Sequence, residues 1–157
     1  MPYPHIIHHG AINGVTGSCH QLHMDAHSSL LIDCGIFQGN DSAADERARK
    51  IDFSIQGIKA LIVTHVHADH IGRIPYLLAA GFEGPIICSE PSAKLLPLVL
   101  EDAFKLEFSR DTRTLDRYLQ RVQKQTVAIP FGQWFSISQS DAIQARIRLQ
   151  RAGHILG

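Results

Sequence analysis

The chain has 157 residues, 45% hydrophobic and 19% charged, which excludes a disordered tail and is enough to bury the core of one compact domain. Fifteen basic side chains balance fifteen acidic ones, which excludes the overall positive charge of a small nucleic-acid-binding module, so any such contact must be local. The three cysteines have no CxxC spacing, which argues against a disulfide framework or a cysteine-rich zinc module and predicts a reducing, cytoplasmic location.

The N-terminal third predicts an antiparallel meander of short strands. Its first residues lack the basic segment and apolar run of a signal peptide, and no stretch of the chain approaches the ~20 apolar residues that cross a bilayer, so we expect no membrane contact. Short apolar runs at 5–9, 19–25 and 28–34 are separated by turn-forming residues. Residues 38–50 are polar and mixed in charge, which predicts a surface loop or an exposed short helix.

The middle of the chain alternates strands and helices. A short β-branched run at 58–64 (IKALIVT) predicts a buried strand. Residues 70–80 predict a helix that ends at Gly81, and residues 85–89 (PIICS) predict the next strand.

Two longer helices follow. Ser89 and Pro91 are start signals for the first helix, and residues 111–125 carry apolar side chains at the i, i+3, i+4, i+7 spacing of the second. We expect both helices to pack on a sheet through these residues: Leu95, Leu96, Val99, Ala103 and Phe104 in the first, and Leu115, Tyr118, Leu119 and Val122 in the second.

The C-terminal tail returns to strands. Phe135 and Ile137 belong to one short strand, and apolar residues alternate with polar ones over 143–150, which predicts a strand with one core face and one basic, hydrated face. The order of strands, alternating strands and helices, and further strands predicts an α/β fold, a mixed sheet with helices on one face.

The pattern HxHxDH follows the strand at 58–64 directly. His65 and His67 should point the same way from a strand end, and Asp69 and His70 follow on the turn into a helix. Imidazole nitrogens suit Zn²⁺, and a carboxylate can bind a metal or accept a proton, so the pattern predicts a metal site. The alternative, ordinary surface histidines, would produce it by chance in about one such chain in 400.

Two further residues complete the expected site. A zinc site needs at least three protein ligands, and His154, in the segment AGHILG after the last strand, is the natural candidate. Asp33 ends the strand at 28–34, where a buried carboxylate needs hydrogen bonds and could orient a ligand histidine. An ordinary strand-end aspartate facing a turn is the alternative for Asp33.

Longer stretches of the sequence resemble a known family. Asp33, the run from His65 to His70, and His154 resemble the first three motifs of the metallo-β-lactamase superfamily. The sequence segments around these motifs resemble one branch of that superfamily, the β-CASP RNA-processing nucleases: GVTGSCHQL, LLIDCGIFQG, THVHADHIGRIPYLLAAGFEGPIICSEPS and RAGHILG.

The resemblance implies an αββα sandwich and a di-zinc phosphodiesterase that acts on RNA. His65, His67 and His154 would hold one Zn²⁺, Asp69 and His70 would belong to the second ion, and Asp33 would support the site from behind. Asp69, His70 and Asp33 are therefore the expected catalytic residues.

Proteins of this branch continue after the third motif with a β-CASP insert and the second half of the sandwich. We therefore expect residues 1–157 to be a truncated N-terminal half, inactive by itself. In such a half no second sheet would cover the apolar strand faces, which predicts a homo-oligomer that buries more than ~1,000 Å². The faces concerned carry Leu30, Ile32, Ile62, Ile147 and Leu149.

Two other functions compete with a ribonuclease. A small-molecule metallo-hydrolase, such as a thioesterase or a glyoxalase II-like enzyme, is disfavoured by the segments GSCH and GRIPYL. A non-catalytic subunit that binds RNA or protein is disfavoured because every ligand of the first motifs is present.

Two sets of basic residues could hold an RNA backbone. The first is on the last strand: Arg146, Arg148 and Arg151. The second is on the second long helix, where a solvated helix face is the commoner reason for such spacing: Arg110, Arg113, Arg117, Arg121 and Lys124. The remaining histidines have no ligand spacing tied to the site and are interpreted as structural or surface residues: His5, His8, His9, His20, His23 and His27. Of these, His20 is singled out because it belongs to the segment GSCH.

Overall fold

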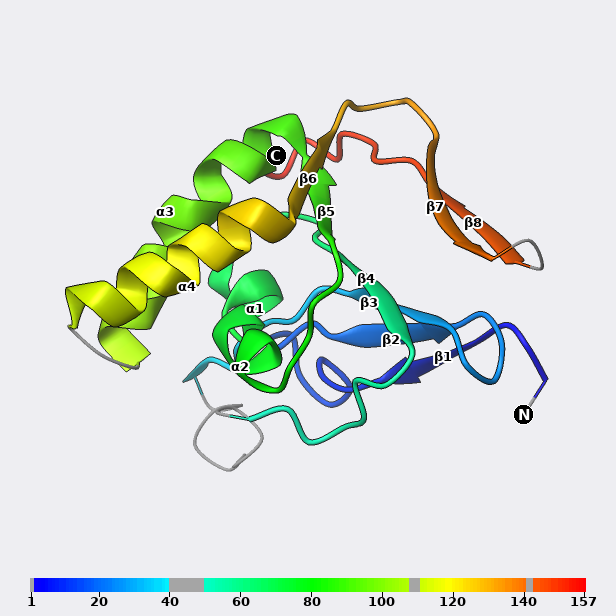
Figure 1. Ribbon diagram of the computed structural model, residues 1–157, viewed down its shortest axis with the longest axis horizontal. Coiled ribbons are helices and arrows are strands. Elements are labelled where there is room, and N and C mark those ends of the chain that lie inside the picture. Colours follow the sequence, from blue (N-terminus) through cyan, green and yellow to red (C-terminus); the bar gives the residue numbers. More distant parts are fainter. Residues whose placement is uncertain (1, 40–49, 108–110, 141–142) are drawn as a thin grey trace.

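A six-stranded mixed sheet forms the centre of the molecule (Figure 1). The computed structural model describes residues 2–39, 50–107, 111–140 and 143–157, so most of the predicted polar loop over 38–50 lies outside the described residues. The strands lie side by side in chain order: β1 (His5–His8), β2 (His20–His23), β3 (Ser29–Ile32), β4 (Ile58–Ile62), β5 (Ile86–Ser89) and β6 (Thr126–Ile129). The first three are antiparallel, as the predicted meander requires, and β3 to β6 are parallel.

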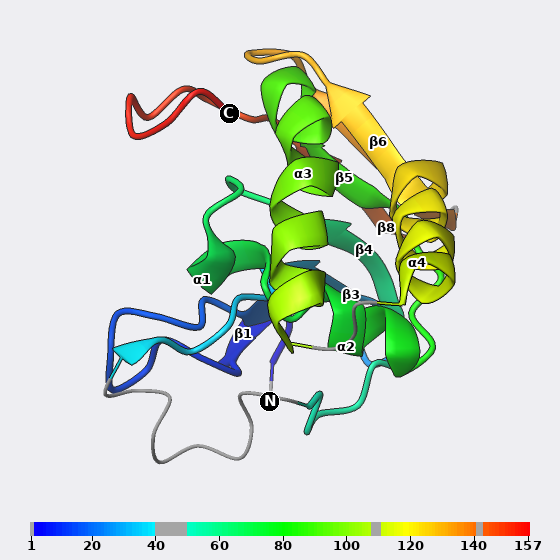
Figure 2. The same cartoon turned by 90° about the vertical axis from the view of Figure 1, so that its left-hand side faces the viewer.

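Helices cover one face of this sheet, as expected. They are α1 (Ala68–Ile71), α2 (Ile74–Ala79), α3 (Glu90–Glu107) and α4 (Thr112–Gln125), and Figure 2 shows α3 and α4 in front of the strands. The apolar stripes of α3 and α4 supply Leu96, Leu100, Leu115 and Val122 to a core shared with Leu61 of β4. Within the described ranges no helix has the length and apolarity needed to cross a membrane.

A hairpin of β7 (Phe135–Ser140) and β8 (Ile143–Ile147) packs against the opposite face of the sheet (Figure 1). The expectation of uncovered strand faces is therefore wrong for Leu30 and Ile62, which are only 3% and 6% exposed. They share a second core with Ile137 of β7, because the alternating side chains of the tail turn their apolar face inward. The other three apolar residues of the expected open face, Ile32, Ile147 and Leu149, are partly buried against the same core.

The helix predicted over 70–80 is two short helices. The break falls at Gly72 and Arg73, between α1 and α2. Pro75 lies in the first turn of α2 and has no N–H to continue a helical ladder from the preceding turn. The end of α2 is as predicted, since Gly81 follows it with φ +102°, a conformation that glycine adopts without steric cost.

Strand β6 was not predicted. It begins at Thr126, directly after the last residue of α4, with no glycine or proline between them. Such four-residue strands carry little periodicity, and β6 is recognisable only from its pairing with the buried strand β5.

Candidate metal centre

The predicted site lies at the carboxyl ends of β3 and β4. These strands are parallel neighbours, so the residues that follow them meet at one edge of the sheet. Asp33 comes directly after β3, and the segment with His65 and His67 begins three residues after β4. The sheet therefore brings together two motifs that are separated by the 31 residues 34–64.

Three histidines converge at this edge. Nε2 of His65 lies 3.1 Å from Nδ1 of His67, and Nε2 of His154 lies 3.3 Å from the same Nδ1. One ligand atom from each of the three residues falls within 4.8 Å of the others, and this is the one such group of three among the residues described. Ligands held ~2.0–2.1 Å from a tetrahedral zinc ion are themselves about 3.3 Å apart, so the three imidazoles fit Zn²⁺.

The electrostatics of the group also suit a metal. Burial lowers the pKa of His65, and the neighbouring imidazoles of His70 and His67 lower it further. The neutral form of the ring, which carries the free lone pair that a metal needs, is therefore favoured at neutral pH.

Asp69 and His70 form an adjacent pair. Nε2 of His70 lies 3.6 Å from Oδ2 of Asp69, and the ring centroids of His70 and His65 are 3.9 Å apart. The pair thus borders the three histidines without joining their ligand set. A carboxylate oxygen and an imidazole nitrogen are both atoms that can bind a metal ion.

Asp33 supports His70 from inside the protein. The residue is 2% exposed and has φ +59°, and its Oδ2 lies 2.7 Å from Nδ1 of His70. Burial lowers the pKa of His70, but the hydrogen bond and charge of Asp33, with the charge of Asp69, outweigh that effect and raise it overall. A proton held on Nδ1 leaves Nε2 free to face outward, which is the arrangement that a ligand histidine needs.

Two supporting residues were missed by the sequence analysis. Thr64 donates to Asp33 from its backbone N–H, at 2.8 Å, and from its hydroxyl, at 2.9 Å to Oδ2, and Ser18 donates to the same oxygen at 3.1 Å. The motif GSCH pointed at His20 instead, whose Nδ1 lies 2.8 Å from Nδ1 of His8 across β1 and β2. A buried carboxylate at a strand end needs several hydrogen-bond donors, so the hydroxyl residues within the motif segments, Ser18 and Thr64, could have been proposed as its partners.

Backbone hydrogen bonds hold the loops of the site together. The N–H groups of Cys34 and Ile36 donate to the carbonyls of His70 and Ala68 at 2.8 and 3.1 Å, and Ser18 N–H donates to the carbonyl of Asp69 at 2.8 Å. The segment after β3 is thus bonded to the helical turn that carries Asp69 and His70.

Gly35 is required for this close approach, which leads to a testable expectation. A Cβ at this position would lie 1.6 Å from the carbonyl oxygen of Asp69, a backbone atom that cannot rotate away. We expect Gly35→Ala to lower the free energy of unfolding by at least about 3 kcal/mol in urea titrations. Gly132→Ala is the control, because Gly132 has φ +75° and open space around it, so it should lose only about 1 kcal/mol. Equal losses of unfolding free energy in the two variants would show that the close approach to Asp69 is not the reason for glycine at position 35.

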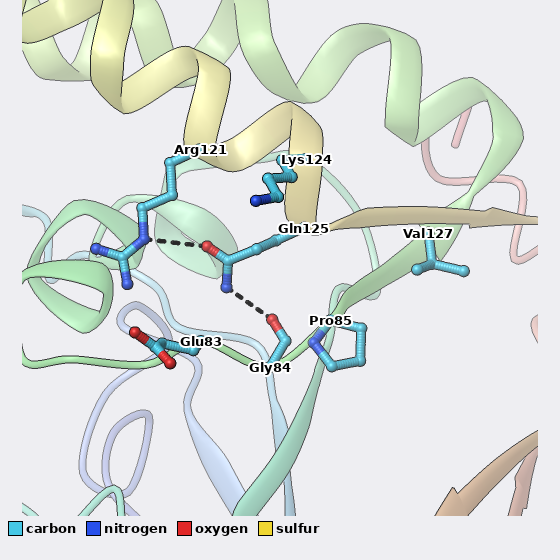
Figure 3. A pocket seen from close by; sticks show the side chains of 7 residues that line it. All are labelled: Glu83, Gly84, Pro85, Arg121, Lys124, Gln125 and Val127. Carbon is cyan, nitrogen blue, oxygen red and sulfur yellow. Dashed lines mark hydrogen bonds between the residues drawn. The ribbon is translucent and has the colours of Figure 1, made fainter.

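A cavity of about 610 Å³ lies at the opposite ends of the parallel strands from the metal centre (Figure 3). Arg121 donates from Nη2 to the carbonyl of Phe82 at 2.8 Å, and Gln125 donates to the carbonyl of Gly84 at 2.7 Å. Nε of Arg121 also donates to the Gln125 amide oxygen at 3.2 Å. Arg121 therefore fastens α4 to the turn before β5. Of the other basic residues expected on this helix, Arg113, Arg117 and Lys124 are exposed, and Arg110 lies outside the described residues.

Comparisons with known proteins agree with the fold and the motifs. The Lactamase_B profile, the metallo-beta-lactamase superfamily, matches residues 24–139. Ribonuclease TTHA0252 of Thermus thermophilus is 38% identical over 101 residues, which cover 64% of this chain and 23% of that protein. Transcription termination factor FttA of Methanocaldococcus jannaschii is 32% identical over 130 residues, which cover 82% of this chain and 20% of that protein. The chain thus spans about a fifth of the length of these relatives.

A solved structure supports the fold independently. The structure described as "Peroxy diiron species of chemotaxis sensor ODP" superposes with a TM-score of 0.54 at 18% identity, covering 98% of this chain and 53% of that one. This likeness confirms the expected α/β architecture. The names of these two relatives, a ribonuclease and a transcription termination factor, agree with the RNA-processing branch that the motifs around Asp33 and His154 resemble. The profile match covers most of the sequence, so the chain belongs to the metallo-beta-lactamase superfamily.

Proposed function

We propose that this chain carries the metal-binding part of a zinc-dependent phosphodiesterase that hydrolyses RNA. The observation that carries the proposal is the convergence of His65, His67 and His154 at distances that fit one tetrahedral ion. The names of the relatives, a ribonuclease and a transcription termination factor, support RNA as the substrate class. The chain spans about a fifth of the length of these relatives, so we propose the activity for the whole protein to which these residues correspond.

The proposed reaction assigns each side chain of the site a metal-binding, proton-accepting or positioning role. His65, His67 and His154 would hold one zinc ion, and Asp69 and His70 would contribute to a second. Zinc supplies a Lewis acid that polarises a phosphoryl oxygen and lowers the pKa of the water it binds. The partly buried carboxylate of Asp69, 3.6 Å from Nε2 of His70, would accept a proton from the attacking water. Asp33 keeps the ring of His70 in one orientation and is a positioning residue.

The test is cleavage of a labelled, unstructured RNA in the presence of zinc. We expect cleavage by a native protein that contains this chain together with the remaining ligands of the second ion, and its loss in His67→Ala. We expect no turnover by the 157 residues alone, because their described part supplies only Asp69 and His70 to that ion and two-metal chemistry needs both positions filled.

Three outcomes would contradict the proposal in part or as a whole. Turnover by the 157 residues that disappears in His67→Ala would refute the need for further ligands. Hydrolysis of a thioester but not of RNA would favour the small-molecule hydrolase. Tight RNA binding without any zinc-dependent cleavage would favour the non-catalytic subunit.

Self-association and a cytoplasmic location stay predictions. The surface available for self-association is smaller than expected, because the hairpin of β7 and β8 covers Leu30 and Ile62. What stays open is a groove of about 500 Å³ between β2–β3 and β8, lined in part by Leu22, Met24 and Ile32.

A further inference from the structure

An exposed tryptophan on the hairpin lies beneath two arginines. The guanidinium carbons of Arg146 and Arg148 are 5.3 and 5.0 Å from the ring centroid of Trp134, and the tryptophan residue is 58% exposed. Arg146 pairs with Ser136 across the hairpin, and both side chains point to solvent. The outer face of the hairpin is therefore cationic and aromatic, while its inner face packs on the sheet.

A second pair extends this surface toward the metal centre. The guanidinium of Arg151 lies 5.1 Å from the ring centroid of Phe131, and the N–H of Gly132 donates to the carbonyl of Leu149 at 2.9 Å. His154 follows three residues later, and three residues of extended chain span at most about 11 Å. The backbone at the last arginine of the row, Arg151, is thus no more than about 11 Å from that of a histidine of the metal centre.

Acidic side chains are scarce along this part of the chain. Between Phe131 and Gly157 the sequence contains one acidic residue, Asp141, which lies outside the described residues. The exposed face of α4 differs, because Asp111 and Asp116 are interspersed among its basic residues. An unbalanced cationic row attracts a polyanion, whereas a mixed face is typical of a solvated helix.

We propose that the basic-aromatic surface, defined by Phe131, Trp134, Arg146, Arg148 and Arg151, binds single-stranded RNA and leads it to the metal centre. The guanidinium groups would contact phosphates, and the exposed ring of Trp134 would stack on a base. Stacking on a protein ring requires a base that is free of its neighbours, which selects single strands over duplex RNA. This inference rests on the proposed function, since it names the path by which that substrate reaches the site.

The experiment uses a property of the sequence: Trp134 is the only tryptophan. The 157-residue chain is titrated with an unstructured oligouridine of about ten nucleotides in EDTA, so that cleavage and metal binding play no part. We expect quenching of the tryptophan fluorescence, with a dissociation constant in the ~1–100 µM range of sequence-independent binding. Arg148→Gln should weaken binding and reduce the slope of log affinity against log salt by about one.

A labelled oligonucleotide gives a second readout. By fluorescence anisotropy, Trp134→Ala should weaken binding about 5- to 150-fold, and Trp134→Phe, which keeps a ring, should retain most of the affinity. These side chains are exposed, so circular dichroism should show unchanged folding. Arg113→Gln on α4 is the matched control, with the same loss of charge on an exposed residue, and should leave affinity unchanged.

Three results would overturn the inference. They are absence of quenching over that concentration range, an equal loss of affinity in Arg113→Gln, and equal quenching by an RNA duplex. Because EDTA removes the metal from the titration, a failed cleavage assay would leave the binding result intact, and failed binding would leave the zinc site intact.

Discussion

His67→Ala is expected to lower the zinc affinity of the chain by more than ~100-fold. Nδ1 of His67 lies near both other histidines of the group, 3.1 Å from Nε2 of His65 and 3.3 Å from Nε2 of His154. Its loss leaves two imidazoles, too few for a stable zinc site. Loss of a residue that only orients a ligand costs 10–100-fold, so loss of a ligand itself should cost more.

Competition with a chromophoric zinc chelator measures this affinity. The wild-type chain should take up zinc, and His27→Ala should bind it equally well, because His27 is an exposed residue in the turn between β2 and β3. The variant pair controls for weak binding by surface histidines. An unchanged affinity in His67→Ala, or an equal loss in His27→Ala, would contradict the assignment of the centre.

The histidines within one segment could be predicted from the sequence. His65 and His67 follow a buried apolar strand, and alternate residues at a strand end face the same way, so their proximity is a local property. His154 is different, since its contact with His67 depends on the path of the coil after β8, which crosses the edge of the sheet. No local pattern determines that path, so the role of His154 was predicted from the resemblance to the third motif of the family.

The parts that sequence analysis missed are tertiary. Thr64 and Ser18 resemble ordinary strand-end and turn residues, and their role becomes visible only when Asp33 is seen to be buried between them. The cover provided by the hairpin could not be foreseen either. The alternation in residues 143–150 predicts an apolar face for the strand, but it does not say which surface that face packs on.

Asp33→Ala is expected to lower the free energy of unfolding by about 3 kcal/mol or more. The substitution leaves the donors of Thr64, Ser18 and His70 without their common acceptor in a buried setting, and alanine tolerates φ +59° poorly. Urea titration measures the loss. Asp116→Ala, at an exposed position on α4, should change stability by no more than about 0.5 kcal/mol.

Asp33→Asn separates the positioning role from the structural one. Asparagine tolerates the left-handed backbone and keeps one acceptor, so it should lose less stability than alanine. It also removes the charge that holds a proton on Nδ1 of His70 at 2.7 Å. We expect ¹⁵N shifts of the imidazole to show the Nδ1–H form of His70 in the wild-type chain and a shift toward the Nε2–H form in Asp33→Asn. A tautomer unchanged in this variant would mean that Asp33 stabilises the loop without orienting the histidine, since a purely structural role would alter the unfolding midpoint and leave the ring unaffected.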